Sequence, residues 1–258
     1  MNYKDRKMRD SSLNRISVYF VIVSLSLMLS GCLDIRRSAM VKGSLTTTSQ
    51  FRKVDSFDQL NICGHFNVNL VESNSPYLKV KANQKDPDII YSEVKDRTLL
   101  ISCADTGKKK SMRDNPELEV GYSQLKRIDL NGVIDLIAAK PIVFDTMSIM
   151  INGIAGLEAS LDGHLLIADF NGPVSVSLKG SVDKTRITMP GAGVVDAEEL
   201  ISNAVYFAML GAGKADVYAR EELKVKIMGA GIVRYHGQPE SVSSNIGGLG
   251  RLTKVNVR

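Results

Sequence analysis

Two carboxylates and one guanidinium recur at equivalent positions of a repeated pattern. Asp196, Asp216 and Arg234 each stand five residues after the first glycine of a Gly-Ala-Gly turn. If the repeats stack, Asp196 and Asp216 lie about 5 Å apart on adjacent coils, with Arg234 next in the row. Such a carboxylate pair can bind Ca²⁺ or serve a retaining glycosidase. Solvated strand positions neutralised by a neighbouring arginine are the interpretation that we favour.

Other reactive residues are sparse. The three histidines, His65, His164 and His236, fall in separate segments, and no pair has a metal-ligand spacing such as H-x-x-x-H. No Gly-Ala-Gly turn opens a helix with a Lys-Ser/Thr pair, as a phosphate-binding loop would. The sequence therefore predicts a protein that is not an enzyme and that needs no metal or cofactor.

The most specific local motif is Leu29-Ser30-Gly31-Cys32, which resembles the lipobox of bacterial lipoproteins. It follows a basic stretch and an apolar run, residues 16–29, that is short for a bilayer span. We expect residues 1–31 to be a lipoprotein signal peptide and Cys32 to be lipidated. Acyl chains would contribute about 0.8 kcal/mol per buried methylene and hold the protein to the cell envelope, at the outer membrane.

Charge and cysteine content constrain the exported part further. The net charge is +5, but residues 1–31 carry five basic and two acidic side chains, which leaves +2 for the rest. This balance does not favour nucleic acid as a partner. Lipidation of Cys32 would leave Cys63 and Cys103, a pair that can form a disulfide in an exported protein. The sequence leaves open whether these two cysteines meet.

The elements that must position these residues are strands. Residues 32–55 lack a sustained period and predict a flexible tether. Residues 56–120 contain a strand of alternating apolar residues at 62–70, and further strands at 77–82, 89–94 and 98–103. We expect this N-terminal segment to be continuous with the repeats that follow.

Seven glycine corners, spaced 18–21 residues apart, mark repeats across residues 121–258. Apolar residues precede and follow each corner at alternate positions. A lone strand pair cannot bury such a face, but repeats stacked about 4.8 Å apart close a continuous core. We therefore predict an all-β fold, a parallel β-helix or β-solenoid with coils of about 18–21 residues.

Asparagine precedes the first three corners, at Asn131, Asn152 and Asn171. Stacked coils would align these residues into a hydrogen-bonded ladder along one edge. Asparagine and glycine also tolerate positive φ, which suits tight corners.

The corners MPGAGVV, MLGAGKA and IMGAGIV and the strand FDQLNICGHFNVNLVE resemble the family known as putative auto-transporter adhesin, head GIN domain. The resemblance covers about residues 55–250. It implies a β-helix-like exported protein of Gram-negative bacteria, and it brings no catalytic residues. The first three corners depart from the family pattern, because Asn-Gly replaces glycine-small-glycine.

Together these features predict a cell-envelope lipoprotein with a non-catalytic, adhesin-like binding or structural module. Its partner would be an unknown envelope protein or a glycan. The alternative is a carbohydrate-active enzyme, a polysaccharide lyase or hydrolase, that uses Asp196 and Asp216. The absence of tryptophan counts against it, because sugar rings stack on aromatic faces. Open strand edges near residues 249–257 also predict homo-oligomers.

Overall fold

A computed structural model describes residues 47–83, 90–103 and 116–255 of the chain. The predicted signal peptide and Cys32 lie outside the described residues. Every regular element within these ranges is a strand, and none of it forms a helix of the length and apolarity that a membrane span requires. The strands are β1 (Thr47–Lys53), β2 (Gln59–Glu72), β3 (Tyr77–Asn83), β4 (Ile90–Lys95), β5 (Thr98–Cys103), β6 (Glu117–Tyr122), β7 (Arg127–Asn171), β8 (Pro173–Met189), β9 (Ala192–Met209), β10 (Ala212–Ile227), β11 (Ala230–His236), β12 (Ser241–Ile246) and β13 (Leu249–Lys254).

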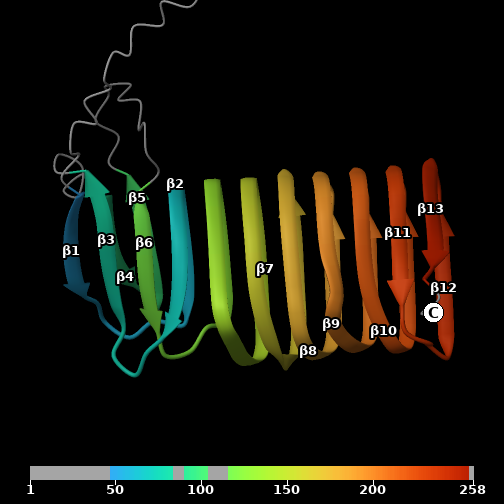
Figure 1. The fold of residues 1–258 in the computed structure, drawn as a ribbon, viewed down its shortest axis with the longest axis horizontal. Coiled ribbons are helices and arrows are strands. Elements are labelled where there is room, and N and C mark those ends of the chain that lie inside the picture. The colour runs from blue at the N-terminus through green and yellow to red at the C-terminus, as the bar shows by residue number, and fades with distance from the viewer. Residues whose placement is uncertain (1–46, 84–89, 104–115, 256–258) are drawn as a thin grey trace, which may run out of the picture. The chain divides into compact units, whose positions relative to one another are not determined.

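The repeats form the predicted parallel β-solenoid. From β2 onward the strands lie side by side along the long axis, in the order β2, β7, β8, β9, β10, β11 and β13 (Figure 1). Equivalent residues of successive coils pair in parallel register, for example Ala155 with Val174 and Ala212 with Ala230. These pairs are separated by 19 and 18 residues, within the predicted coil length. One strand runs continuously through the first two corners, at Gly132 and Gly153, so β7 alone extends over 45 residues.

The apolar positions beside the corners form the core. At the first six corners, the residues two places before the corner are at most 1% exposed, and those four places after it are at most 2% exposed. The first set comprises Leu130, Ile151, Phe170, Met189, Met209 and Ile227, and the second comprises Leu136, Leu157, Val176, Val195, Ala215 and Val233. Thr185, six places before the corner at Gly191, is polar but also buried, and its hydroxyl lies 2.8 Å from that of Ser202. The apolar residues that recur at every second position therefore fill the interior of the solenoid.

Glycine is required at the corners because the coils approach there backbone to backbone. Gly132 has a φ of +128°, and a Cβ added to it would lie 2.2 Å from the carbonyl oxygen of Gly64 on the preceding coil. Gly153 has the same relationship to Gly132. The expectation that asparagine also uses positive φ is wrong, since only Asp96 and Arg97 do so among the described non-glycine residues. The glycines that follow these asparagines, Gly132, Gly153 and Gly172, adopt positive φ, and the asparagines have a different role.

The asparagines form the predicted ladder. The side-chain amide of Asn171 donates to Asn152, and that of Asn152 to Asn131, at 3.2 and 3.1 Å. Asn131 donates in turn to Asn61 at 3.2 Å. Asn61 extends the ladder by one coil beyond the sequence prediction. The next corner after Asn171 carries Pro190, which has no side-chain donor.

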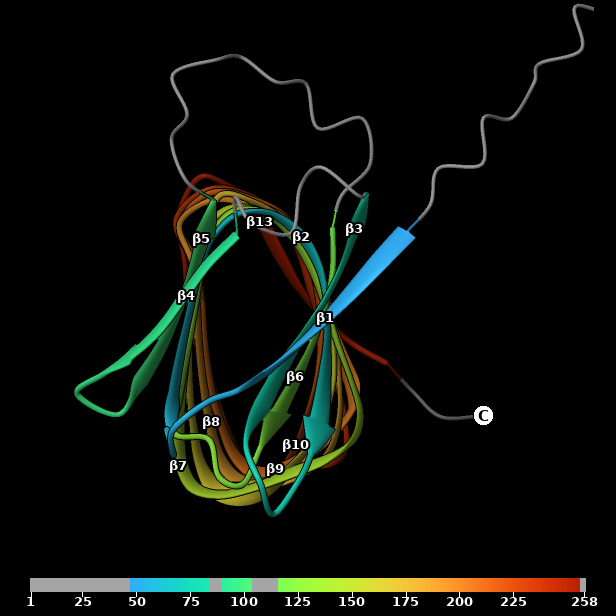
Figure 2. The ribbon, with the colours of Figure 1, turned by 90° about the vertical axis from the view of Figure 1, so that its left-hand side faces the viewer.

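The N-terminal end of the solenoid is built differently. β2 pairs with β7 on one side, and with both β5 and β6 on the other. Three further pairings are antiparallel: β3 pairs with β6, β1 pairs with β3, and β4 pairs with β5. Viewed from this end (Figure 2), the coils overlie one another as a flattened ring from which the β4–β5 hairpin projects.

β1 corrects the tether prediction, because residues 47–53 form a strand within the segment assigned to a flexible linker. Long-range contacts fix it. The ring of Phe51 stacks on that of Tyr77 with centroids 5.2 Å apart. Arg52 donates to the carbonyl of Ile90 at 2.7 Å and to the hydroxyl of Ser92 at 2.8 Å. These partners are remote in sequence, so a local period could not reveal them.

Candidate functional site

The outward side chains that follow the corners form two parallel rows on one side of the solenoid, which we call the post-corner face. Three residues after each corner the row runs Asn67, Asp135, Gly156, Ser175, Val194, Lys214 and Ile232. Five residues after each corner it runs Asn69, Ile137, Glu158, Ser177, Asp196, Asp216 and Arg234. Strand pairing places consecutive members of each row on neighbouring strands. Most of this surface is polar.

The predicted column of Asp196, Asp216 and Arg234 is present. Asp196 pairs in register with Asp216, and Asp216 with Arg234. The two carboxylates are not equivalent, however. Asp196 is exposed and accepts a bond of 3.4 Å from the backbone N–H of Glu198. Asp216 is only 3% exposed, although it faces outward, because neighbouring side chains cover it.

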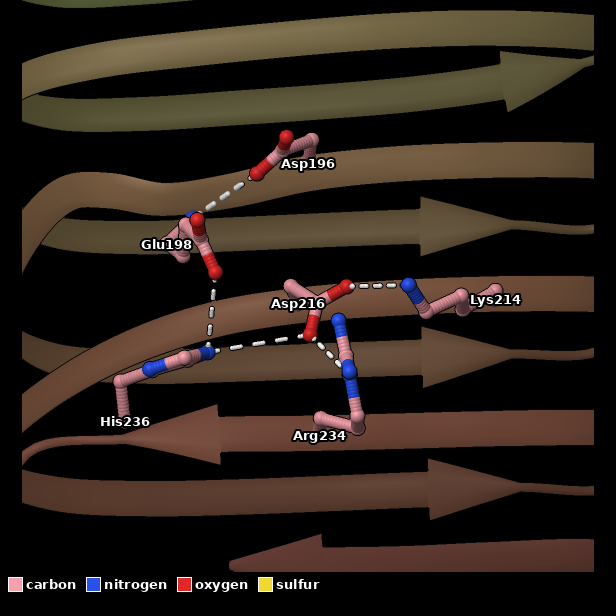
Figure 3. A network of polar contacts seen from close by, with 6 residues as sticks. All are labelled: Asp196, Glu198, Lys214, Asp216, Arg234 and His236. Atoms are coloured by element: carbon pink, nitrogen blue, oxygen red, sulfur yellow. Dashed lines mark hydrogen bonds and ion pairs between the residues drawn. The ribbon is translucent and has the colours of Figure 1, made fainter. Parts of the chain in front are cut away.

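Two cations hold the buried carboxylate of Asp216. Arg234 Nε lies 2.5 Å from Oδ1, and Lys214 Nζ lies 3.2 Å from Oδ2 (Figure 3). Burial alone would raise the pKa of Asp216, but the hydrogen bonds and charges of Arg234 and Lys214 outweigh burial and lower the pKa below its ordinary value. Asp216 is therefore an ionised carboxylate whose two oxygens are already paired.

Glu198 and His236 complete this network. His236 Nε2 lies 3.3 Å from Glu198 Oε2 and 3.7 Å from Asp216 Oδ1. Nε2 is buried, and neither contact is a hydrogen bond. Glu198 reaches the site because β9 has extra residues beside both neighbours, between Ser177 and Lys179 of β8 and between Val217 and Tyr218 of β10. Such β-bulges commonly redirect a side chain at a surface site.

The chemistry available to this network is limited. Ligand atoms of Glu198, Asp216 and His236 lie within 4.8 Å of one another, a spacing that a metal ion could bridge. A cation there would have to displace Arg234 or Lys214 from Asp216, and its charge would be repelled by both. Asp216 also cannot serve as a protonated general acid at neutral pH, since its pKa is lowered. The arrangement therefore favours an ion-pair network over a reaction centre.

A second feature of the post-corner face is a shallow groove of about 600 Å³ over β2, β6, β7 and β8. Its outward lining residues are Asn67, Asn69, Glu117, Asp135, Ile137, Gly156, Glu158, Ser175 and Ser177. Gly156 provides the floor, and the carboxylate of Asp135 leans over it, 2.5 Å from where a Cβ would lie. The groove thus exists partly because one position in the row has no side chain.

The cysteines Cys63 and Cys103 lie on neighbouring strands. Cys63 pairs with Ser102, which places Cys103 one residue further along β5. Both thiols are free: Cys63 is exposed, whereas Cys103 is partly buried and packs against the core. Burial raises the pKa of the Cys103 thiol. A disulfide between Cys63 and Cys103 stays a prediction for oxidising conditions.

The sequence interpretation found part of this face. It identified the row that contains Asp196 and Asp216, but missed Lys214, which lies in the row three residues after the corner. It also missed the groove residue Asp135, and it did not select Glu158 as a site residue although Glu158 belongs to the same row as Asp196. Counting the outward positions three residues after each corner would have revealed Lys214 and Asp135. Glu198 could not be found in that way, because its position depends on a bulge.

Comparison with known proteins supports the fold. The family model described as putative auto-transporter adhesin, head GIN domain, matches residues 56–239. No curated protein matches the sequence.

Solved structures resemble the solenoid closely. A putative adhesin from Bacteroides fragilis has a TM-score of 0.71 and 23% identity, covering 82% of this chain and 98% of its own. A putative lipid binding protein from Parabacteroides distasonis has a TM-score of 0.62 and 22% identity, covering 81% and 97%. A putative adhesin from Parabacteroides merdae has a TM-score of 0.61 and 17% identity, covering 81% and 96%. At these identities the similarity establishes the fold alone.

Proposed function

Since the chain belongs to the family described as putative auto-transporter adhesin, head GIN domain, we propose that it is a cell-envelope lipoprotein with a non-catalytic binding module. The module would act as an adhesin does, by holding a protein or a glycan of the envelope or cell surface.

The post-corner face is the observation that carries this proposal. Seven coils present outward side chains in two continuous rows, and a groove with polar lining follows those rows across several strands. Extended surfaces of this kind are what solenoid proteins use to bind elongated partners. The pairing of Asp216 with Arg234 and Lys214 lends no support to the carbohydrate-active alternative.

Binding of an envelope component and its catalytic cleavage can be measured separately. We expect the purified protein to be retained on immobilised envelope polysaccharide or protein, and to release neither reducing sugars nor unsaturated products from it. Product release that is lost in Asp196→Asn would instead establish the enzyme. Absence of retention on every envelope component would contradict the binding function.

Anchoring through Cys32 forms the second part of the proposal. The lipobox Leu29-Ser30-Gly31-Cys32 supports it, and multiple acyl chains give stable attachment where a single chain is marginal. We expect globomycin to block processing and Cys32→Ala to move the protein out of the outer-membrane fraction. Unchanged processing and fractionation in both experiments would remove the anchor from the proposal.

Self-association is a further part of the proposal, and β12 supports it. Its sequence SVSSNI has no charge and no proline, and all six residues are exposed. Within the described residues it has a single partner strand, β10. Edges that lack charges or proline tend to pair with other chains. We expect light scattering to detect oligomers that Val242→Lys disperses; a monomer at high concentration would argue against this contact.

A further inference from the structure

The groove on the post-corner face contains hydrogen-bonding groups that the protein itself does not use. Asp135 and Glu158 are exposed, and neither side chain has a hydrogen bond or an ion pair with any described residue. The side chains of Asn67, Ser175 and Ser177 are likewise exposed and without such partners in the described ranges. The ion-pair network around Asp216 differs, because its carboxylate already has two cations.

The charge of the groove limits what can occupy it. Glu117 is paired with Lys81 at 2.8 Å and accepts a bond from Asn69 at 3.3 Å, so its charge is largely compensated. The charges of Asp135 and Glu158 are not compensated in this way, and the described residues that line the groove include no lysine, arginine or histidine. An anionic ligand would meet uncompensated repulsion there. The occupant must therefore bring hydrogen-bond donors and no negative charge.

The mixture of groups favours a sugar chain over a basic peptide. A basic peptide would satisfy the two free carboxylates through its side chains, but exposed ion pairs contribute little, and only its backbone groups could bond to the amide and the two hydroxyls. Hydroxyl groups can donate to carboxylates and can both donate to and accept from amides and serine hydroxyls. Ile137, which is 43% exposed between these polar groups, offers an apolar contact for the C–H face of a ring.

The shape of the groove agrees with an elongated ligand. Its lining residues come from β6, β2, two successive coils of β7 and β8, which are stacked at the spacing of neighbouring strands, about 4.8 Å. That spacing is close to the length of one sugar ring. A volume of about 600 Å³ is within the range of ligand-binding sites.

We infer that this groove binds an extended, uncharged glycan, with Asp135 and Glu158 accepting hydrogen bonds from its hydroxyl groups. The inference rests on the proposed binding function and specifies its site and ligand class.

The test uses the full chain and calorimetric titration with named probes. These are neutral hexasaccharides of glucan, mannan and galactan, an anionic hyaluronan hexasaccharide and a hexalysine peptide. We expect binding of a neutral hexasaccharide that is unchanged between about 0.05 and about 0.5 M salt, because no ion pair contributes. Asp135→Asn and Glu158→Gln should each weaken it by about tenfold, the effect of removing a hydrogen bond to a charged acceptor.

Gly156→Val gives a variant that fills the groove without a change of fold. Gly156 has no positive φ, and the atom that a Cβ would meet is the mobile end of Asp135. It should abolish binding, whereas Asp162→Asn, an exposed carboxylate of β7 outside the groove, should leave affinity unchanged. Equal melting temperatures of all variants would establish that they fold.

Different results would reject the neutral glycan as ligand, the groove as its site, and the binding function itself. Salt-sensitive binding of hexalysine alone, or no binding of any neutral hexasaccharide, would overturn the glycan assignment. Neutral glycan binding that survives Asp135→Asn, Glu158→Gln and Gly156→Val would overturn the location. In each case the protein would still be retained on its envelope partner if the proposed function holds.

Discussion

Nε of Arg234 lies 2.5 Å from Oδ1 of Asp216, across the parallel pairing of β11 with β10. Asp216 is the one carboxylate of the post-corner rows that is buried, at 3% exposure, and Lys214 holds its second oxygen. Asp196, one coil away in the same row, remains exposed. The stacking of coils therefore gives equivalent positions similar geometry but different roles.

This difference predicts unequal effects of removing the two carboxylates. Asp216→Ala should lower the free energy of unfolding by about 1–3 kcal/mol, because it removes two charge-assisted bonds and leaves Arg234 and Lys214 adjacent. Asp196→Ala should change it by less than about 0.5 kcal/mol, as an exposed surface substitution does. Urea denaturation of both variants tests this. Equal effects would show that the Asp216 pairing has no structural importance.

Acid should destabilise the protein through Asp216 and Asp58. Burial would raise the pKa of Asp58, but Arg97 and Lys126, each 3.1 Å from its carboxylate, outweigh that effect and lower the pKa. Both groups thus stay ionised in the folded protein at a pH where the unfolded chain, with ordinary aspartate pKa values of about 3.9, takes up protons. Their contribution to stability is complete above about pH 5 and is lost as pH falls through the lowered pKa values.

The measurement is the free energy of unfolding as a function of pH. Replacing both residues, Asp58→Asn with Asp216→Asn, should make the curve flatter below about pH 4 than in the parent protein. A parallel decline in parent and double variant would mean that other carboxylates cause the acid sensitivity.

Corner glycines that lie against the backbone of the preceding coil, such as Gly132, should tolerate no side chain. Gly132→Ala places a Cβ 2.2 Å from the Gly64 carbonyl oxygen at a φ of +128°, so it should cost at least about 2 kcal/mol. Gly156→Ala is the matched control in the same strand, where only the Asp135 carboxylate has to move, and should cost less than about 1 kcal/mol. Thermal denaturation compares them, and similar melting temperatures would refute the close stacking of corners.

The asparagine ladder predicts a graded series. Asn152 both donates to Asn131 and accepts from Asn171, whereas Asn171 only donates within the described ladder. Asn152→Ala should therefore lose about twice the stability that Asn171→Ala loses, at about 0.5–1.5 kcal/mol per bond. A larger loss for Asn171→Ala would contradict the ladder as the source of the effect.

Much of the solenoid could be predicted because its information is periodic. Leu130, Ile151 and their equivalents recur with the corners, so counting residues was enough to assign both the core and the register of Asp196 with Asp216. The N-terminal end could not be predicted in this way. β2 and β7 are successive coils, yet Gln59 pairs with Arg127, because β3 to β6 are inserted between them. Contacts such as Phe51 with Tyr77, and the bulge that carries Glu198, likewise depend on tertiary structure.

The central claim is that the post-corner face is where the protein holds its partner, and photo-crosslinking in intact cells tests it most directly. A benzophenone amino acid would replace Ile137, within the groove, or Val143, which is 70% exposed outside that face. We expect adducts with an envelope glycan or protein from position 137 and none from position 143. Adducts from position 143 alone, or none from either position, would contradict it.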